Sequence, residues 1–506
     1  MENVITAFSN LFNPLYMSII AGGTLCGIFV GVMPGLSSVM GLTIMLPITF
    51  TLKGEGGILM MLGIFCGAIY GGSITACLLN TPGTANSAAT CLDGYPLAVK
   101  YGQASRALGL STYASTFGGI FSAIMLLWTA PMLAKIALKF SPAEYFGLMV
   151  FGISIVTGLS GKNVIKSMLG ACLGLLLATI GVDSISGIYR FTFDTVFLGG
   201  GISFIPVLIG LFAFSQGLIS VEEEFGKKGQ KAANVNLKGL LPSFADIKVT
   251  FPTVIRSSII GTIIGAIPGT GGDIASWLGY NEAKRWSKHP EKFGDGAIDG
   301  IVAPESANNA VSGGALIPLL TLGIPGDSGT AIMLGAFMMQ GLIPGPLLFT
   351  EQTAKVYTII FGLFAANIMM GFFGFAGIRM FAKIIQIPKT IMTPMIFVFC
   401  FVGTYAMNHD MNDIILMIVA GVVGFFILKL DFSIPPIILG MILGRPAEEN
   451  LRRSLVLSNG DPLVFFKRPI SCALIIIALL SLFYPFVLPW IRKKIALKRN
   501  GSKPQE

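Results

Sequence analysis

Four Pro-Gly pairs interrupt apolar stretches of the chain, at Pro34-Gly35, Pro82-Gly83, Pro268-Gly269 and Pro325-Gly326. Because proline lacks an amide donor and glycine tolerates non-helical dihedral angles, each pair is predicted to end one helix and to begin another. A helix that begins there presents unpaired N–H groups and the positive end of its dipole, which bind an anion without a basic side chain. The pattern therefore predicts an anion site built largely from the main chain.

The residues beside these pairs supply hydroxyl and amide groups, and none of the four motifs contains Lys or Arg. We expect the substrate-binding residues to be Gly35, Ser37, Ser38, Asn80, Thr81, Gly83, Thr84, Gly269, Thr270, Gly271, Gly272 and Gly326. Main-chain dipoles and hydroxyl groups would hold a carboxylate, with sodium ions as a candidate counter-charge. We expect no catalytic residue, no organic cofactor and no metal beyond sodium; sodium ions or protons would be the coupling ions.

Carboxylates adjoin the Pro-Gly motifs in the second half of the chain, where they would repel a bare anion. Ionisable groups inside a membrane are costly and often functional, so Asp273 and Asp327, with the amides of Asn308 and Asn309, are candidates for cation coupling. Alternatively, either aspartate caps a helix N-terminus and contributes roughly 1 kcal/mol to stability, and the asparagines merely link helices. Glu305 is either a further functional acid or a residue at the membrane edge.

Enzymatic functions have little support in the sequence. The chain has two histidines, His289 and His409, and neither has a metal-ligating partner at helical spacing. Ser37 and Ser38 have no nearby base, which argues against a hydrolase. We therefore expect a secondary active transporter and not an enzyme.

The composition indicates which elements must position these motifs. Of 506 residues, 53% are hydrophobic and 12% are charged, against roughly a quarter charged in soluble domains; the mean hydropathy is +0.78. Repeated apolar runs of about 20 residues predict helices that cross a bilayer. We expect an all-α integral membrane protein with about 10 to 13 membrane segments, which excludes soluble enzymes and nucleic-acid-binding proteins.

The Pro-Gly motifs also recur at a regular offset. The segment around Pro34 matches that around Pro268 at an offset of 234 residues, and the segment around Pro82 matches that around Pro325 at 243. A weaker block, with Gly174 and Gly424, matches at 250. This order predicts a first transmembrane repeat over residues 1–217, a cytoplasmic connector over 218–250, a second repeat over 251–490 and a basic C-terminal tail over 491–506.

The loop charges favour an inverted arrangement of the two repeats. The loop 281–292 is rich in Lys and Arg, whereas its counterpart 51–57 is not; after the second Pro-Gly element the bias reverses, with Lys100 and Arg106 in the first repeat. Under the positive-inside rule, such reversals are what repeats of opposite orientation produce. Lys135 and Lys139 fall on the side of the membrane where this arrangement expects few basic residues, so their side chains would have to snorkel from a helix end. The substrate would then bind between the hairpin tips near the midplane.

Five motifs in order carry a family resemblance: residues 31–38 (GVMPGLSS), 79–84 (LNTPGT), 266–272 (AIPGTGG), 303–309 (APESANN) and 323–328 (GIPGDS). The chain resembles, over nearly its whole length, the large membrane subunit of the tripartite tricarboxylate transporter family. The resemblance implies a secondary carrier of the bacterial inner membrane, driven by an ion gradient, with sodium expected, for citrate or related carboxylates. It also implies two partners, a small membrane subunit and a periplasmic solute-binding protein.

Two other functions fit the same residues. One is a stand-alone carboxylate or amino-acid symporter that needs no binding protein, and the other is an anion channel. Obligate dependence on a periplasmic protein, gradient-coupled uptake without one, and passive conductance distinguish the three functions.

Overall fold

The computed structural model describes residues 2–33, 36–52, 54–159, 164–183, 185–224, 242–384 and 389–482. The predicted site residue Gly35, most of the connector and the whole C-terminal tail lie outside the described residues. The chain divides into two compact units, one formed by residues 1–138 and 205–426 and the other by 139–204 and 427–506. Each unit takes segments from both predicted repeats, and the division into repeats stays a prediction.

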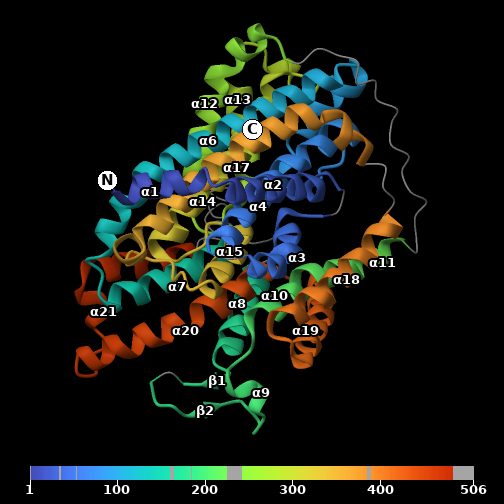
Figure 1. Ribbon diagram of the computed structural model, residues 1–506. Coiled ribbons are helices and arrows are strands. Elements are labelled where there is room, and N and C mark those ends of the chain that lie inside the picture. Colours follow the sequence, from blue (N-terminus) through green and yellow to red (C-terminus); the bar gives the residue numbers. More distant parts are fainter. Residues whose placement is uncertain are drawn as a thin grey trace, which may run out of the picture. The chain divides into compact units, whose positions relative to one another are not determined.

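The first unit is entirely helical in its described part (Figure 1). Its N-terminal elements are α1 (Glu2–Leu11), α2 (Pro14–Val32), α3 (Ser38–Thr51), α4 (Gly56–Leu79), η1 (Ala85–Ser87), α5 (Cys91–Tyr95), η2 (Pro96–Lys100) and α6 (Ala104–Ala137). The middle elements are α10 (Phe204–Leu208), η3 (Ile209–Phe214), α11 (Ser215–Glu224), α12 (Phe244–Ala266), α13 (Gly271–Trp286) and η4 (Pro290–Lys292). The last elements are α14 (Asp299–Leu322), α15 (Ser328–Met339), α16 (Leu348–Glu351), α17 (Thr353–Ile384), α18 (Lys389–Asn408) and α19 (Met411–Lys429).

The three Pro-Gly pairs within the described residues lie between helices, which confirms those predicted breaks; Pro34 and Gly35 lie outside the described residues. The breaks separate α2 from α3, α4 from η1, α12 from α13, and α14 from α15. The Ser37 side chain caps α3 by accepting from the Met40 amide at 3.1 Å, and Ser243 and Asp246 form a capping box at the start of α12. Such caps satisfy amides that the first turn of a helix leaves free.

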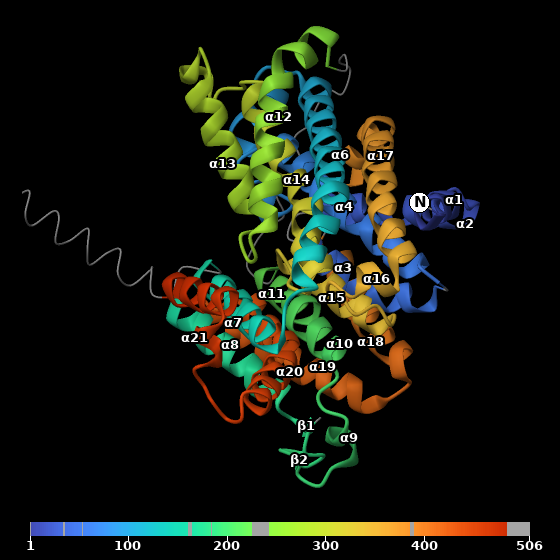
Figure 2. The same cartoon turned by 90° about the vertical axis from the view of Figure 1, so that its left-hand side faces the viewer.

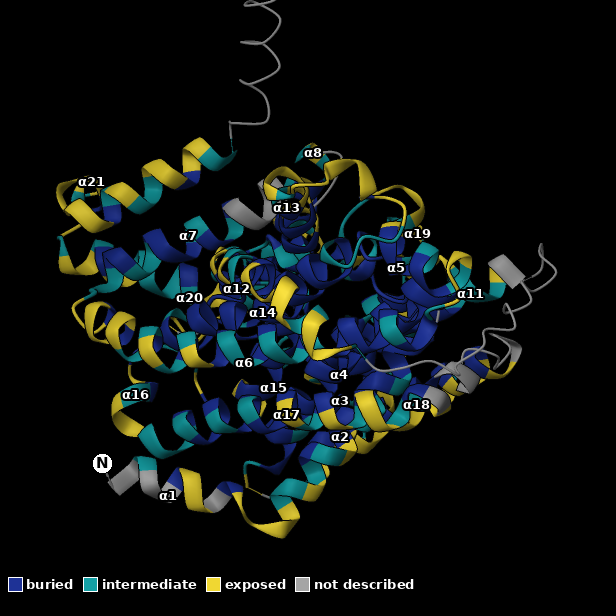
Figure 3. Cartoon of the chain, turned by 90° about the horizontal axis from the view of Figure 1, so that it is seen from above, coloured by how far each residue is buried: buried dark blue, intermediate teal, exposed yellow. Residues whose placement is uncertain are grey.

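Two helix pairs pack closely in this unit, α2 with α4 and α12 with α14, and Figure 2 shows α12 beside α14. The pairs pack closely because glycines replace side chains at equivalent positions. A Cβ atom at Gly31 would lie 2.3 Å from the Ala68 carbonyl oxygen, and one at Gly265 would lie 2.8 Å from the Val311 carbonyl oxygen. The helices α4 and α14 are buried along almost their whole length (Figure 3).

The second unit contains α7 (Pro142–Leu159), α8 (Val164–Ala178), α9 (Val196–Gly199), α20 (Ile434–Leu457), α21 (Val464–Lys467) and a helix over Pro469–Leu482. Its strands β1 (Gly181–Val182) and β2 (Tyr189–Arg190) form a short antiparallel ladder in which Gly181 pairs with Arg190. The helix α8 packs on α20, where a Cβ atom at Gly174 would lie 2.0 Å from the Ile437 carbonyl oxygen.

Charged residues tie the strand pair of this unit to α20. Arg452 donates to both oxygens of Asp183, at 2.9 and 2.7 Å, and Arg190 donates to both oxygens of Glu448, at 2.9 and 3.1 Å. The hydrogen bonds from Arg452 and Ser186 hold the pKa of Asp183 well below its usual range. Ion pairs therefore stabilise this region, in contrast to the charge-poor centre of the first unit.

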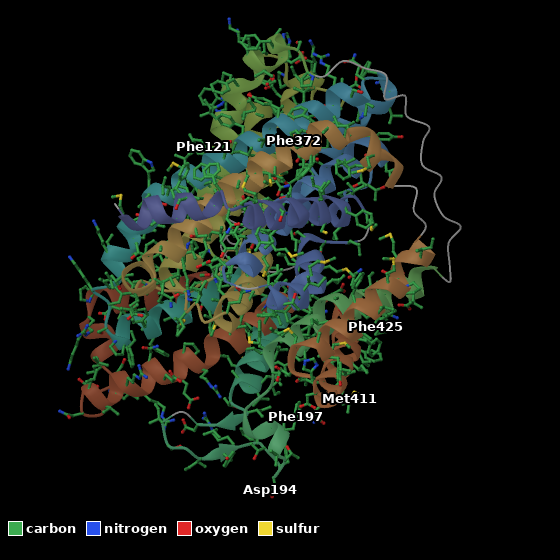
Figure 4. The ribbon with its side chains drawn as sticks, in the orientation of Figure 1. Phe121, Asp194, Phe197, Phe372, Met411 and Phe425 are labelled. Atoms are coloured by element: carbon green, nitrogen blue, oxygen red, sulfur yellow. The ribbon has the colours of Figure 1, made fainter. Side chains whose placement is uncertain are left out.

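The helices confirm the predicted class of an all-α, multi-pass membrane protein. Among the described residues, eight helices are long and apolar enough to cross a membrane, in α2, α4, α6, 204–222, α12, α17, α18 and α19. Four shorter helices, α3, α8, α15 and the helix over Pro469–Leu482, are also apolar. Large apolar side chains project outward from α17 and α19, among them Phe372 and Met411, as lipid-facing residues do (Figure 4). The expected number of 10 to 13 segments stays a prediction.

Three segments predicted to be cytoplasmic lie beside one another in the first unit. Lys100 forms an ion pair with Asp295 at 2.5 Å, which joins the segment after η2 to the loop before α14. Arg106 at the start of α6 donates to Asp246 at 3.0 Å, where the connector enters α12. These contacts agree with the side of the membrane inferred from loop charges, although the inverted orientation of the repeats stays a prediction.

Candidate functional site

The Pro-Gly breaks pair within each predicted repeat. In the first repeat, the Gly83 amide donates to the Gly72 carbonyl oxygen at 3.2 Å, and a Cβ atom at Gly83 would lie 2.2 Å from the Gly31 carbonyl oxygen. In the second, the Gly269 amide donates to the Gly326 carbonyl oxygen at 2.7 Å, and a Cβ atom at Gly326 would lie 2.4 Å from the Gly265 carbonyl oxygen. Both glycines that follow proline are thus needed for close backbone approach.

The two repeats meet at the start of α13. A Cβ atom at Gly272 would lie 2.5 Å from Oδ1 of Asn308 on α14 and 2.7 Å from Nδ2 of Asn86 in η1. The side chains of Asn86 and Asn308 therefore converge on one point, although the two residues are more than 200 positions apart in the chain. Gly272 is a predicted site residue, whereas Asn86 is not.

Several buried polar atoms on α14 and in the segment 84–87 have no hydrogen-bond partner. Both amide atoms of Asn308 and the hydroxyl oxygens of Thr84 and Ser87 are unpaired, and all three residues are almost fully buried. The two hydroxyl oxygens lie 2.4 and 3.0 Å from a Cβ atom built on Gly72. We name Thr84, Asn86, Ser87, Gly272 and Asn308 the amide-hydroxyl cluster. Because a buried polar group without a partner costs about 1 to 3 kcal/mol, the cluster is suited to a polar ligand.

The helix that begins at the cluster has no side-chain cap from its N-cap residue, Thr270. By contrast, α3 is capped by Ser37 and α15 by Asp327, whose side chain accepts from the Thr330 amide at 2.7 Å. The side chain of Thr270 makes no such bond to α13. Its hydroxyl group instead donates to the carbonyl oxygens of Ile264 and Ile267, at 2.5 and 2.8 Å. The amides of Asp273 and Ile274 in the first turn donate instead to the carboxyl group of Asp273, so a carboxylate already lies at the positive end of α13.

The other predicted substrate-binding residues occupy varied places. Ser38 is buried in the first turn of α3, and Asn80 and Thr81 are exposed at the end of α4, where Asn80 adopts a left-handed conformation with φ of 55°. Gly271 opens α13 with φ of 71°. The substrate-binding roles of all these residues stay predictions.

The predicted cation-coupling residues also differ in their surroundings. Asp327 makes the capping contacts that its alternative interpretation expects, whereas Asp273 is exposed in the first turn of α13. Asn309 donates from Nδ2 to the Glu305 carbonyl oxygen at 3.0 Å. Asn308 has no partner and belongs to the amide-hydroxyl cluster. Their part in cation coupling stays a prediction.

Glu305 lies inside the protein, whereas its depth in the membrane, at the edge or further in, stays a prediction. Glu305 is fully buried in α14, and its carboxyl oxygens accept from the hydroxyl groups of Thr90 at 2.5 Å and Ser115 at 3.1 Å. Both donors belong to the first repeat and Glu305 to the second. The charges at the start of α14 suggested an exposed end, but the helix is enclosed by α4, α6, α12 and α13.

A second buried carboxylate joins the repeats at Asp93 in α5. Its Oδ1 accepts from the amides of Gly294, Gly296 and Ala297 at 2.8 to 2.9 Å, and its Oδ2 accepts from the Tyr280 hydroxyl at 2.9 Å. Three main-chain donors and one side-chain donor therefore satisfy a charge that has no room for a ligand. The sequence alone does not reveal this site, since the donors to Asp93 lie about 200 residues away.

The chemistry available in the cluster is recognition and not bond breaking. Neutral amide and hydroxyl groups with a helix N-terminus can donate hydrogen bonds to a carboxylate. Among the described residues, no group of three or more His, Cys, Asp or Glu residues could hold a metal ion.

Comparison with known proteins identifies the family. The family model for the tripartite tricarboxylate transporter TctA family matches residues 17–439. A protein of Agrobacterium vitis described as "Uncharacterized 52.8 kDa protein in TAR-I ttuC' 3'region" is 38% identical over 494 residues, which cover 98% of this chain and 97% of that protein. A second protein of that organism, from the TAR-II ttuC' 3' region, is 38% identical over 234 residues, 46% of this chain and 96% of its own length. No solved structure matches significantly. With its apolar spans and its motifs, the chain therefore belongs to the tripartite tricarboxylate transporter TctA family of multi-pass membrane proteins.

Proposed function

We propose that the protein is the large membrane subunit of a carrier that takes up citrate or a related tricarboxylate across the bacterial inner membrane, driven by a sodium gradient. A small membrane subunit and a periplasmic solute-binding protein that delivers the substrate would complete the system. The observation that carries this proposal is the convergence of the Asn86 and Asn308 side chains at Gly272, where both amide atoms of Asn308 are unpaired.

The cluster suits an anion that must be released again. Amide and hydroxyl donors bind carboxylate oxygens with less Coulombic attraction than a buried Lys or Arg would supply. The positive end of the α13 dipole adds attraction for negative charge. A carrier needs a site of moderate affinity, because a substrate held by a buried ion pair would dissociate slowly.

Sodium ions would balance the substrate charge. The proposed coupling groups are the carboxylates of Asp273 and Asp327 and the amide oxygens of Asn308 and Asn309, which are hard oxygen ligands of the kind that alkali cations prefer. The Asp327 carboxyl group already accepts a hydrogen bond from the Thr330 amide at 2.7 Å. It can coordinate sodium only if the ion and this amide bind the carboxyl group together.

Reconstituted vesicles test the proposal. At equal pH on both sides and zero potential, we expect citrate accumulation to require the periplasmic binding protein, the small subunit and an inward sodium gradient. Gradient-driven uptake without the binding protein would support the stand-alone symporter, and passive citrate current without accumulation would support the anion channel.

A further inference from the structure

The carboxyl group of Glu305 is a buried charge that the proposed substrate site does not use. It lies in the interior of α14, six residues from the first residue of the helix, with no exposed surface. Its recorded partners are the hydroxyl groups of Thr90 and Ser115. Two neutral donors offset only part of the cost of an ionised carboxylate away from water.

No cation faces Glu305 among the described residues. The helices α4 and α5 bring the Tyr70 phenol and the thiols of Cys77 and Cys91 into electrostatic contact with it, and none of these carries positive charge. From α6 it meets only Ser115. None of the other charged groups on elements packed against α14 is a recorded partner of Glu305. These groups are Asp93 in α5, Arg106 and Lys135 on α6, Asp246, Lys248 and Arg256 on α12, Asp273, Glu282, Lys284 and Arg285 on α13, Asp327 before α15 and Glu351 on α16.

The geometry favours a proton over a sodium ion at this carboxyl group. A sodium ion would have to stand between the carboxyl oxygens and other oxygen ligands. Here the hydroxyl oxygens contact the carboxyl oxygens directly, at 2.5 and 3.1 Å, so no ion can lie between them. A proton needs no such space, because it forms one O–H bond on a carboxyl oxygen.

Glu305 is linked to the amide-hydroxyl cluster by two short paths. Asn308 follows it by three residues, so both side chains lie on one face of α14. The Thr90 amide donates to the Ser87 carbonyl oxygen at 3.2 Å, which connects the hydroxyl partner of Glu305 to η1. When the carboxyl group gains a proton, it becomes a donor and one of its two hydroxyl partners must turn to accept.

We propose that Glu305 binds the proton that this carrier transports together with its substrate. This inference rests on the proposed carrier function. The Glu305 carboxylate accepts one proton from water on the side where substrate enters, forming an O–H bond, and that bond breaks when the proton passes to water on the other side. No electron is transferred. The protonated form removes a negative charge from the neighbourhood of an incoming carboxylate.

Vesicles with equal sodium on both sides and a clamped potential test the proposal. We expect the wild type to accumulate citrate when the outside is acidic, about tenfold for one proton and one pH unit, and to acidify the lumen as citrate enters. Glu305→Gln should keep citrate counterflow within about threefold of wild type but lose the pH-driven accumulation. Glu351→Gln, an exposed matched control on α16, should behave as wild type.

The outcomes separate this inference from the proposed function. If the wild type exchanges citrate but neither accumulates it in a pH gradient nor acidifies the lumen, or if Glu305→Gln keeps the pH response, the proton role is wrong while the carrier stands. If the wild type shows no counterflow, both fall. Should Glu305→Gln fail to assemble, Glu305→Asp decides: a kept pH response with luminal acidification supports the proposal, and its loss overturns it.

Discussion

Asp93 and Glu305 are both fully buried carboxylates that join the predicted repeats, yet they are built for different tasks. Asp93 accepts four hydrogen bonds, three of them from main-chain amides that cannot turn away. Glu305 accepts two, both from hydroxyl groups that can rotate and accept instead. Main-chain amides can only donate, whereas hydroxyl groups can donate or accept and so fit both forms of a carboxyl group. The comparison separates a structural carboxylate from one that can change its charge.

The largest expected effect comes from removing the structural carboxylate. Asp93→Ala leaves three amides and the Tyr280 hydroxyl without their acceptor, so we expect a loss of about 3 kcal/mol or more in stability. Thermal unfolding in detergent measures the effect. Asp93→Asn keeps an acceptor for the amides and should lose much less; equal stability of the alanine variant and the wild type would contradict the assigned role.

The next effect concerns the unpaired amide of the cluster. Asn308→Ala should weaken citrate binding about 10- to 100-fold, since a hydrogen bond to a charged ligand contributes about 1.5 to 3 kcal/mol. Stability should change little, because the removed atoms have no partner. Calorimetric titration with citrate measures the affinity of the purified wild type and of Asn308→Ala. The control is Asn367→Ala, which changes an equally buried asparagine on α17. Unchanged citrate affinity would remove Asn308 from the site.

A smaller effect on stability is expected at Glu305. A glutamine has the shape of the protonated acid and can both accept and donate between Thr90 and Ser115, so Glu305→Gln should unfold within about 1 kcal/mol of wild type. Thermal unfolding in detergent, measured for Glu305→Gln and Asp93→Asn side by side, compares the two carboxyl groups directly. A loss of several kcal/mol would show that Glu305, too, is held as a permanent anion.

The smallest effect is a pH dependence at Asp183 in the second unit. Its pKa is lowered in the folded state, chiefly by the hydrogen bond from Arg452, so its stabilising contribution is present above the unfolded pKa of about 3.9 and is lost as pH falls further. We expect the melting temperatures of wild type and Asp183→Asn to differ by a constant amount between about pH 5 and 7 and to converge below about pH 4. A difference that grows on acidification would contradict this sign.

The sequence by itself determined the membrane class, the helix breaks and the family. Apolar run length fixes a membrane helix, and Pro-Gly pairs break helices through local covalent geometry, so both follow from short stretches of chain. These local rules also identified Gly272, Thr84 and Asn308 as site candidates. They do not show that Ser37 accepts from the Met40 amide or that Thr270 donates to the Ile264 carbonyl oxygen, because only the folded chain positions these main-chain atoms; the substrate-binding roles of both residues stay predictions.

Only the tertiary structure decided which polar groups share a site and which are satisfied. Asn86 and Asn308 converge, Glu305 meets Thr90 and Asp93 meets Gly294 across more than 190 residues of chain. A residue's burial and its number of donors depend on segments brought together by packing, not on its neighbours in sequence. The same carboxylate can therefore be a fixed anchor or a proton site, and the packing of distant helices selects between them.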